Sequence, residues 1–262
     1  MKETISTAIE NFVADYQRQE HIRSSWGGPL VGFADAADPL FPDLKQAVSP
    51  THAVPQDILV DARTVIAFFL PFPKSLATTN AKERMSSREW AIIYIETNEL
   101  IASLSEHLQQ FFEKLGASSR TIPATHNWDE KLLISNWSHR HIAYIAGLGN
   151  FGLNNMLITK KGCCGRVGSL VTAYPVEADV RRQTPSCLYK FDGSCRKCVR
   201  KCVNEALTDE SFDRFRCYAM LQNNVDGHTE VGYADVCGKC QVAVPCSHND
   251  PVARKLRKVN QG

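Results

Sequence analysis

The alternation of hydrophobic and polar positions along the first half of the chain predicts two amphipathic helices and a buried strand. Residues 3–18 place apolar side chains at helical spacing. Residues 62–73 form a continuous apolar, β-branched and aromatic run closed by prolines, which is typical of a strand buried on both faces. Ser86, with Glu89 three residues later, begins an apolar stripe that ends at Gly116 and predicts a long helix.

The remaining pattern up to residue 174 predicts further strands and one irregular stretch. Residues 24–56 are dense in turn-forming residues, so we expect mostly loop with short elements there. Residues 120–125 predict a strand, and residues 156–174 predict a hairpin with Gly and Cys in its loop. A strand–helix–strand order predicts an α/β (α+β) fold for residues 1–180, which we call the host domain.

Composition narrows the function classes and the compartment. The chain has 262 residues and a formal net charge of +2, which gives no general electrostatic case for binding nucleic acid or an acidic membrane. Its most apolar run, residues 64–70, is far shorter than a bilayer-spanning helix. The N-terminus lacks the charged-then-apolar pattern of a signal peptide, so we expect a cytoplasmic protein.

The richest chemistry lies in residues 181–250, where eight of the ten cysteines gather; residues 251–262 form a basic tail. Cys195-x2-Cys198-x3-Cys202 is the spacing of cubane iron–sulfur proteins, in which the cysteine after the longer gap ligates a second cluster. We therefore expect a ferredoxin-like module with two [4Fe-4S] clusters. The expected ligands are Cys187, Cys195, Cys198 and Cys246 for cluster 1, and Cys202, Cys217, Cys237 and Cys240 for cluster 2.

Zinc and disulfides are the competing interpretations of these cysteines. Zinc would use Cys195 and Cys198 with Cys237 and Cys240, but four further cysteines would then have no role. Disulfides need an oxidising compartment, which the N-terminus does not indicate. Cys163 and Cys164 lie outside the set, either as two ordinary thiols or, for one of them, as an exposed reactive thiol.

A second notable passage surrounds Gly147-x-Gly149-x-x-Gly152. A dinucleotide-binding fingerprint of this form follows a strand and opens a helix, whereas here a helical pattern precedes it. The glycines instead predict a turn that ends a helix and lets a bulky group approach the backbone. His139 and His141 fall on different faces of that helix and make a poor pair of metal ligands.

The order of motifs in the second half resembles the iron–sulfur half of epoxyqueuosine reductases. The residues that carry the resemblance are Gly147-x-Gly149-x-x-Gly152-x-Asn154, the Gly-rich segment after Thr159, Cys195-x2-Cys198-x3-Cys202, Arg216-Cys217 and Cys237-x2-Cys240. These enzymes belong with reductive dehalogenases to a corrinoid-using superfamily that carries ferredoxin-like clusters. Residues 29–35 and 87–90 resemble a short form of this family without the C-terminal repeats of longer relatives.

This resemblance implies a nitroreductase-like host domain, two [4Fe-4S] clusters and a cobalamin held between them. The position of the acidic residue thought to deliver a proton in epoxyqueuosine reductases falls on Leu133, with Asp129 and Glu130 as the nearest carboxylates. Because a flat macrocycle must approach both backbone and cluster, we expect a corrin to contact Gly147, Gly149 and Gly152, with Arg140 as a further contact. The catalytic candidates are Asp129, His139, His141 and Tyr144.

Three functions remain open on the sequence. The first is an oxidoreductase that passes single electrons from an external ferredoxin, flavodoxin or reductase to a cofactor or small substrate in the host domain. The second is an electron carrier without substrate chemistry, and the third is a zinc-dependent interaction module. A carrier needs little beyond the cysteine module, so the large host domain favours the enzyme. Three alternatives are open for that domain: it binds cobalamin, it binds a flavin, or it holds no second cofactor.

Overall fold

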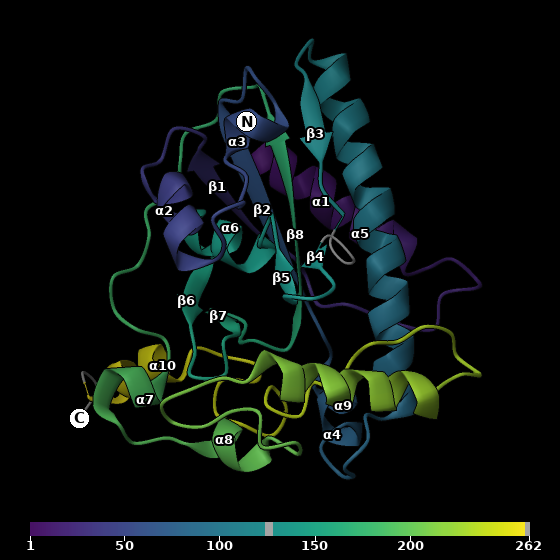
Figure 1. The fold of residues 1–262 in the computed structure, drawn as a ribbon. Coiled ribbons are helices and arrows are strands. Elements are labelled where there is room, and N and C mark those ends of the chain that lie inside the picture. Colours follow the sequence, from purple (N-terminus) through teal and green to yellow (C-terminus); the bar gives the residue numbers. More distant parts are fainter. Residues whose placement is uncertain (124–127, 260–262) are drawn as a thin grey trace.

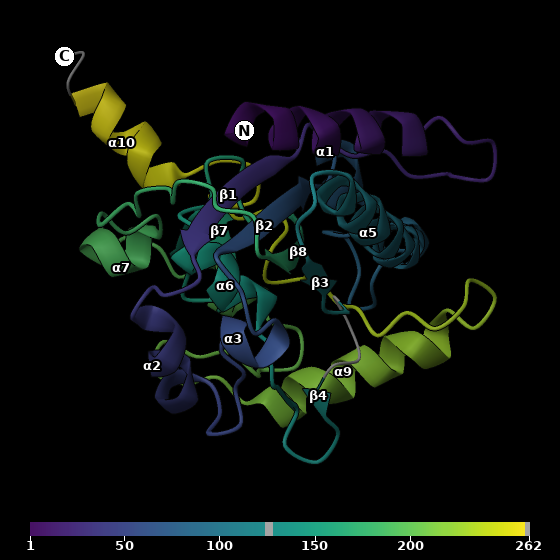
Figure 2. The ribbon, with the colours of Figure 1, turned by 90° about the horizontal axis from the view of Figure 1, so that it is seen from above.

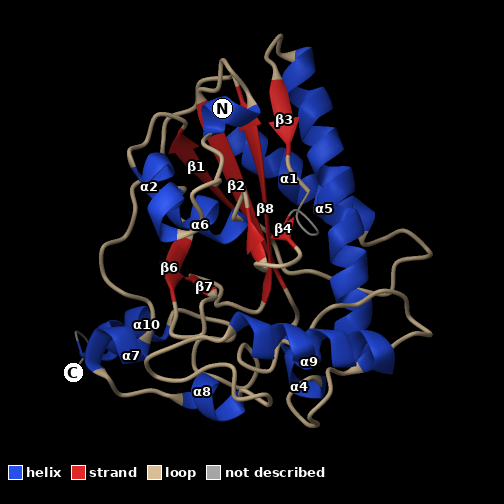
Figure 3. Cartoon of the chain, viewed as in Figure 1, coloured by secondary structure: helices blue, strands red, loops and turns tan. Residues whose placement is uncertain are grey.

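The computed structural model describes residues 1–123 and 128–259 and has a mixed α/β architecture. Figures 1 and 3 show the elements in place. In chain order the elements are α1 (Lys2–Tyr16), β1 (Leu30–Asp35), α2 (Leu40–Ala47), α3 (Pro55–Ile58), β2 (Thr64–Pro71), α4 (Lys74–Thr79), α5 (Arg88–Lys114), β3 (Ser119–Thr121), β4 (Trp128–Asp129), β5 (Ile134–Ser135), α6 (His139–Ile145), β6 (Gly149–Phe151), β7 (Leu157–Thr159), β8 (Gly165–Thr172), α7 (Leu188–Asp192), α8 (Lys197–Lys201), α9 (Arg214–Gly227) and α10 (Pro251–Val259).

A four-stranded antiparallel sheet of order β1-β2-β8-β3 organises the first part of the chain. All eight residues of β2 are buried, as the apolar run predicted. Side chains alternate across the sheet because a strand repeats every two residues. Ile66 and Phe68 therefore face one core, while Val65 and Ala67 face another.

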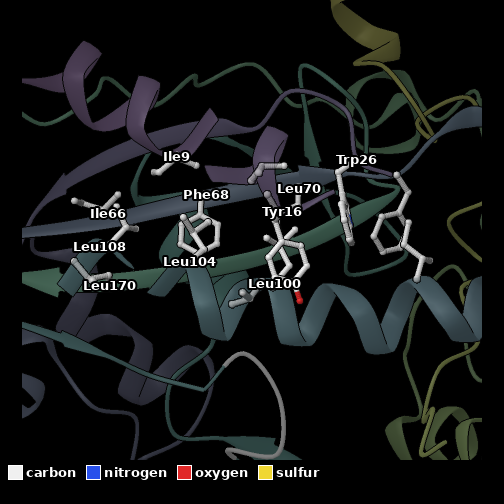
Figure 4. Close-up of a cluster of buried hydrophobic side chains, with 14 of the residues drawn as sticks. Ile9, Tyr16, Trp26, Ile66, Phe68, Leu70, Leu100, Leu104, Leu108 and Leu170 are labelled. Atoms are coloured by element: carbon white, nitrogen blue, oxygen red, sulfur yellow. The ribbon is translucent and has the colours of Figure 1, made fainter. Parts of the chain in front are cut away.

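Helices cover both faces of this sheet. Helices α1 and α5 lie on one face and α2 and α6 on the other, as the view from above shows (Figure 2). Figure 4 shows the first core, where Ile9 of α1 and Leu104 of α5 meet Phe68. Each fully buried side chain of this kind stabilises the fold by about 1.5–3 kcal/mol. The amphipathic helices predicted over residues 3–18 and 86–116 are confirmed.

The start of the long helix differs from the prediction by one residue. Ser87, not Ser86, caps α5, and its side chain accepts a hydrogen bond from Trp90 N. Ser86 is buried and its hydroxyl lies 3.1 Å from Nε2 of His228 in the C-terminal part. Only Ser86 has the Glu three residues later that a capping box needs, and Ser87 has Trp90 at that position, so the spacing rule selected the neighbouring serine.

The stretch expected to be mostly loop with short elements contains two of them, β1, an edge strand of the main sheet, and the helix α2. Two strand predictions need correction or restriction. Residues 156–174 do not form a hairpin, because β7 pairs with β6 while β8 pairs with β2 and β3. Of the strand expected at 120–125, β3 covers Ser119–Thr121, and residues 124 and 125 lie outside the described part of the chain.

The cysteine-rich part gathers at one end of the sheet. Helices α7, α8, α9 and α10 all lie below the sheet, at the end where β8 begins (Figure 1). No helix in residues 1–123 or 128–259 combines the length and apolar character needed to cross a membrane.

Candidate functional site

Cysteines from three separate segments meet in a first group: Cys187, Cys195, Cys198 and Cys246. Cys187 precedes α7, Cys198 lies on α8 and Cys246 comes from the loop before α10. With Leu153 and Val244 they surround a small cavity. Burial, and then the neighbouring thiols of this same group, raise the pKa of Cys198 to about 12. The structure thus brings together the four cysteines expected at cluster 1.

A second group contains Cys202, Cys217, Cys237 and Cys240. Cys202 ends α8, Cys217 lies on the first turn of α9, and the other two belong to the loop after α9. Burial and then Cys237 and Cys202 raise the pKa of Cys217 to about 11. Burial and the other three thiols of the group also raise the pKa of Cys240. These are the four cysteines expected at cluster 2.

The two groups divide the short run of residues 195–202, which includes α8, between them. Cys195 and Cys198 face the first cavity, whereas Cys202 faces the second. The zinc alternative required Cys195, Cys198, Cys237 and Cys240 in one site, but these four fall on two different cavities. Within the described residues, no set of three or more His, Cys, Asp or Glu side chains is placed to hold a single metal ion.

Host-domain residues far away in sequence hold the cysteine loops. Asn80 donates to the carbonyl oxygen of Cys237 at 2.9 Å, and Asn154 donates to that of Cys240 at 2.9 Å. Gly238, between those two cysteines, packs against the indole of Trp90, where an added Cβ would lie 2.4 Å from the ring. The sequence named Asn154 only as part of a motif and did not single out Asn80, since nothing in the local pattern links them to partners 86 and 157 residues away.

A cavity of about 450 Å³ lies between the second cysteine group and the sheet. Its size falls within the usual range of small-molecule sites. Apolar side chains supply much of the wall, including Met156, Leu157 and Val167 from the host domain and Met220 from α9. A molecule in this cavity would therefore contact the host domain and the second cysteine group together.

Two arginines bring positive charge to the wall of this cavity. Arg140 of α6 donates to the carbonyl oxygen of Asn155 at 2.7 Å. The Arg140 side chain is exposed at the cavity wall, where partial desolvation lowers its pKa and the nearby thiols of Cys217 and Cys240 act in the opposite direction. Arg166 of β8 lies over the ring of Tyr94 at 4.5 Å. The guanidinium groups thus sit where a negatively charged cluster or ligand would be stabilised.

The other sequence candidates have different surroundings. His139 lies in the cavity wall, but both ring nitrogens are engaged, with Ser169 Oγ at 2.8 Å and Pro123 O at 2.9 Å. His141 lies 2.7 Å from Ser138 Oγ through Nδ1 and packs on Phe151. The two histidines point to different partners, as the helical spacing predicted.

Tyr144, Asp129 and Leu133 lie outside the cavity wall. Tyr144 packs near Phe151, with 6.0 Å between the ring centroids. Asp129 is exposed and accepts hydrogen bonds from the backbone of Lys131 and Leu132, so it shapes the turn between β4 and β5. Leu133 lies in the same turn with φ +54°.

The glycine turn that follows α6 packs against the chain itself. Gly147 ends the helix with φ +77°, which glycine adopts readily. A Cβ on Gly149 would lie 2.2 Å from the carbonyl oxygen of Ile158, and one on Gly152 would lie 2.5 Å from Asn154 Oδ1. Strand β7 thus approaches the backbone at Gly149 and Gly152. None of the three glycines lines the large cavity, although Gly147 and Gly149 line a separate one.

Comparison with known proteins identifies the fold. No protein-family model and no curated protein matches the chain. A selenomethionine-labelled epoxyqueuosine reductase is similar, with a TM-score of 0.55 and 19% identity, covering 92% of this chain and 66% of that one. The epoxyqueuosine reductase of Streptococcus thermophilus gives a TM-score of 0.57, with 17% identity and coverage of 92% and 65%.

Reductive dehalogenases share the same fold. The catabolic dehalogenase NpRdhA in complex with 3-bromo-4-hydroxybenzoic acid gives a TM-score of 0.57 and 16% identity, covering 88% of this chain and 31% of that one. The chain thus spans just under two thirds of the epoxyqueuosine reductases and about a third of the dehalogenase. The resemblance expected from the sequence motifs is confirmed at the level of the fold.

Proposed function

We propose that this protein is an oxidoreductase that carries two [4Fe-4S] clusters and passes single electrons to a cofactor or small substrate in the large cavity. Cluster 1 is held by Cys187, Cys195, Cys198 and Cys246, and cluster 2 by Cys202, Cys217, Cys237 and Cys240. One observation carries the proposal: eight cysteines fall into two groups of four, and the second group borders a cavity shared with the host domain.

The chemistry of the donor sets fits cubane clusters. Each cluster takes four thiolates, and the crossing of the short run between the two groups is the arrangement of two-cluster ferredoxins. Burial and mutual repulsion oppose ionisation of these thiols, as the raised pKa values of Cys198 and Cys217 show. Iron supplies the positive charge that keeps coordinating thiols deprotonated.

The cavity distinguishes this proposal from a simple electron carrier. A carrier needs no ligand space beside its clusters, whereas here Cys217 and Cys240 share a cavity wall with Arg140 and Leu157 of the host domain. Both clusters exchange electrons only, so the reaction needs an external donor such as a ferredoxin, a flavodoxin or a reductase. We place the cofactor or substrate that accepts these electrons at this wall.

Cobalamin is our proposed second cofactor. One reductive dehalogenase with this fold is associated with B12-dependent dehalogenation. The apolar wall and the two arginines fit a large, mostly apolar ring with polar side groups. Bound cobalamin would supply a cobalt centre that accepts single electrons, and Arg140 would contact it from α6. A flavin is the alternative occupant.

The cluster assignment is tested by iron and sulfide analysis of protein purified without oxygen. We expect about eight iron and eight sulfide per chain, with broad absorption near ~400 nm, because two cubanes contain that number of atoms. Cys198→Ser should disturb one cluster and Cys240→Ser the other, while Cys164→Ser, outside both groups, should keep both. Stoichiometric zinc without this absorption would contradict the proposal.

A further inference from the structure

Cys163 is a ninth thiol that lies against the first cysteine group. Its Sγ lies 3.9 Å from Sγ of Cys246, within hydrogen-bonding distance for sulfur, and the residue is only 3% exposed. Its neighbour Cys164 is also buried, but that thiol donates to the carbonyl oxygen of Gln241 at 3.0 Å. The two adjacent thiols also interact with each other, but only Cys163 lies against a ligand of the first group. Neither is the exposed reactive thiol that the sequence allowed.

Backbone contacts fix the position of the Cys163 thiol. Its N–H donates to the carbonyl oxygen of Cys246 at 2.9 Å, and Cys164 N–H donates to that of Ser247 at 2.9 Å. Gly162 has φ +86°, and a Cβ there would lie 2.3 Å from the carbonyl oxygen of Ser247. The segment entering β8 is thus pressed directly onto the loop that carries Cys246, which leaves the thiol little freedom to move away.

We propose, on the basis of the proposed function, that Cys163 donates its S–H hydrogen to Sγ of Cys246 when this cysteine ligates cluster 1, and thereby raises the reduction potential of that cluster. Reduction adds negative charge to the cluster and its thiolates, so a donor aimed at a ligand sulfur stabilises the reduced state more than the oxidised state. Such contacts just outside the ligand set are a general means of tuning metal centres. Cys163 is a positioning residue, because it acts through Cys246.

The competing role for Cys163 is ligation. Cys163, Cys187 and Cys246 belong to one buried cluster of side chains, so Cys163 lies near enough to be considered as a replacement ligand. Cys163 also lines the large cavity, which none of the four cluster 1 ligands does. Cys163 therefore lies on the cavity side of Cys246, where it can donate a hydrogen bond to this ligand from outside the ligand set.

The test is an anaerobic potentiometric titration followed by EPR, on the wild-type protein and on three variants. Cys163→Ala should make one of the two cluster potentials more negative, by up to about tenfold in the equilibrium constant for reduction, which is ~59 mV for one electron. Cys163→Ser keeps a donor and should restore most of the shift. Cys164→Ala is the matched control, since its thiol donates to a backbone carbonyl and only borders Cys163, and it should shift the potentials much less than Cys163→Ala.

Several outcomes would overturn the inference while leaving the proposed function intact. These are unchanged potentials in Cys163→Ala, an equal shift in Cys164→Ala, or loss of about four iron atoms from Cys163→Ala, which would make Cys163 a ligand. Wild-type protein without any cubane signal would instead refute the proposed function, and this inference with it. Iron analysis of every sample separates the two failures.

Discussion

At the scale of single residues, His139 shows how burial and hydrogen bonds fix one protonation state. Trp137 Nε1 donates to Ser169 Oγ at 3.0 Å, and Ser169 Oγ lies 2.8 Å from His139 Nδ1. His139 Nε2 lies 2.9 Å from the carbonyl oxygen of Pro123, which can only accept, so this nitrogen carries the proton and Nδ1 accepts from the serine. Burial lowers the pKa of His139 to about 4.

This shift predicts a pH-dependent stability. The pKa of His139 in the folded protein lies below its value of about 6.5 in the unfolded chain. Its contribution to the free energy of unfolding is therefore complete above pH ~6.5. It falls as the pH drops toward about 4, because only the unfolded chain binds the proton in that range. The loss reaches about 3 kcal/mol at most. Thermal unfolding of the wild type between these pH values should show this slope.

The variant His139→Gln separates this residue from the rest of the chain. It should flatten part of the dependence of stability on pH. The rest comes in part from His141, because burial lowers the pKa of that residue to about 4 as well. An identical pH slope in the wild type and the variant would contradict the assignment. A neutral, fully engaged His139 is a structural residue of the cavity wall, and the sequence could not show this because Ser169 is 30 residues away.

Among the cysteines, the sequence identified the two groups but not their surroundings. The gaps of two and three residues in Cys195-x2-Cys198-x3-Cys202 carry geometric information, because ligands close in sequence must share or divide clusters. Cys163 and Cys246 are 83 residues apart, and no spacing rule links them. The grouping of the cysteines was therefore predictable from their spacing. Contacts between segments far apart in the sequence could be found only in the folded structure.

At the scale of elements, the strand run of β2 and the stripes of α1 and α5 were predictable because burial imposes a regular period. The pairing of β7 was not. Proximity in sequence favoured a hairpin with β8, yet β7 pairs with β6 and β8 lies in the main sheet. The cause is Gly149, whose bare backbone lets β6 lie directly against Ile158 of β7.

Gly149→Ala should therefore destabilise the fold by about 2 kcal/mol or more, since the new Cβ would meet a carbonyl oxygen that cannot turn aside. Gly28→Ala is the control, because a Cβ there would meet only the flexible end of Lys161, at 3.3 Å. Thermal unfolding of both variants without added cofactor is the measurement. An unchanged midpoint in Gly149→Ala, together with weaker cofactor binding, would support instead the expectation that a corrin lies on this turn.

At the scale of the whole molecule, the candidate site exists only where two parts of the chain meet. The host domain supplies Arg140, Met156 and Leu157, and the later segments supply Cys217 and Met220. Hydrophobic periods describe each element alone, so they could not place the cavity. The sequence did contain one useful indication, namely a host domain larger than an electron carrier needs.

The last prediction concerns what fills this cavity. Titration of the anaerobic, cluster-loaded protein with cob(II)alamin should change the EPR spectrum of the cobalt centre, because the cavity wall and cluster 2 would replace its aqueous surroundings. Arg140→Ala should weaken the binding by about tenfold, since it removes a charged hydrogen-bond donor from the cavity wall. Arg120→Ala, at an exposed position of β3, should leave the binding unchanged.

The possible outcomes separate the remaining functions. A changed spectrum in the wild type that is weakened only by Arg140→Ala would support a corrinoid enzyme with its cofactor between Arg140 and cluster 2. An unchanged spectrum, with flavin released on denaturation, would assign the cavity to the other cofactor. An unchanged spectrum at saturating protein and no released flavin would leave two clusters beside a cavity without a redox cofactor. The electron-carrier function would then be the better account, because electrons leaving cluster 2 would have no acceptor within the chain.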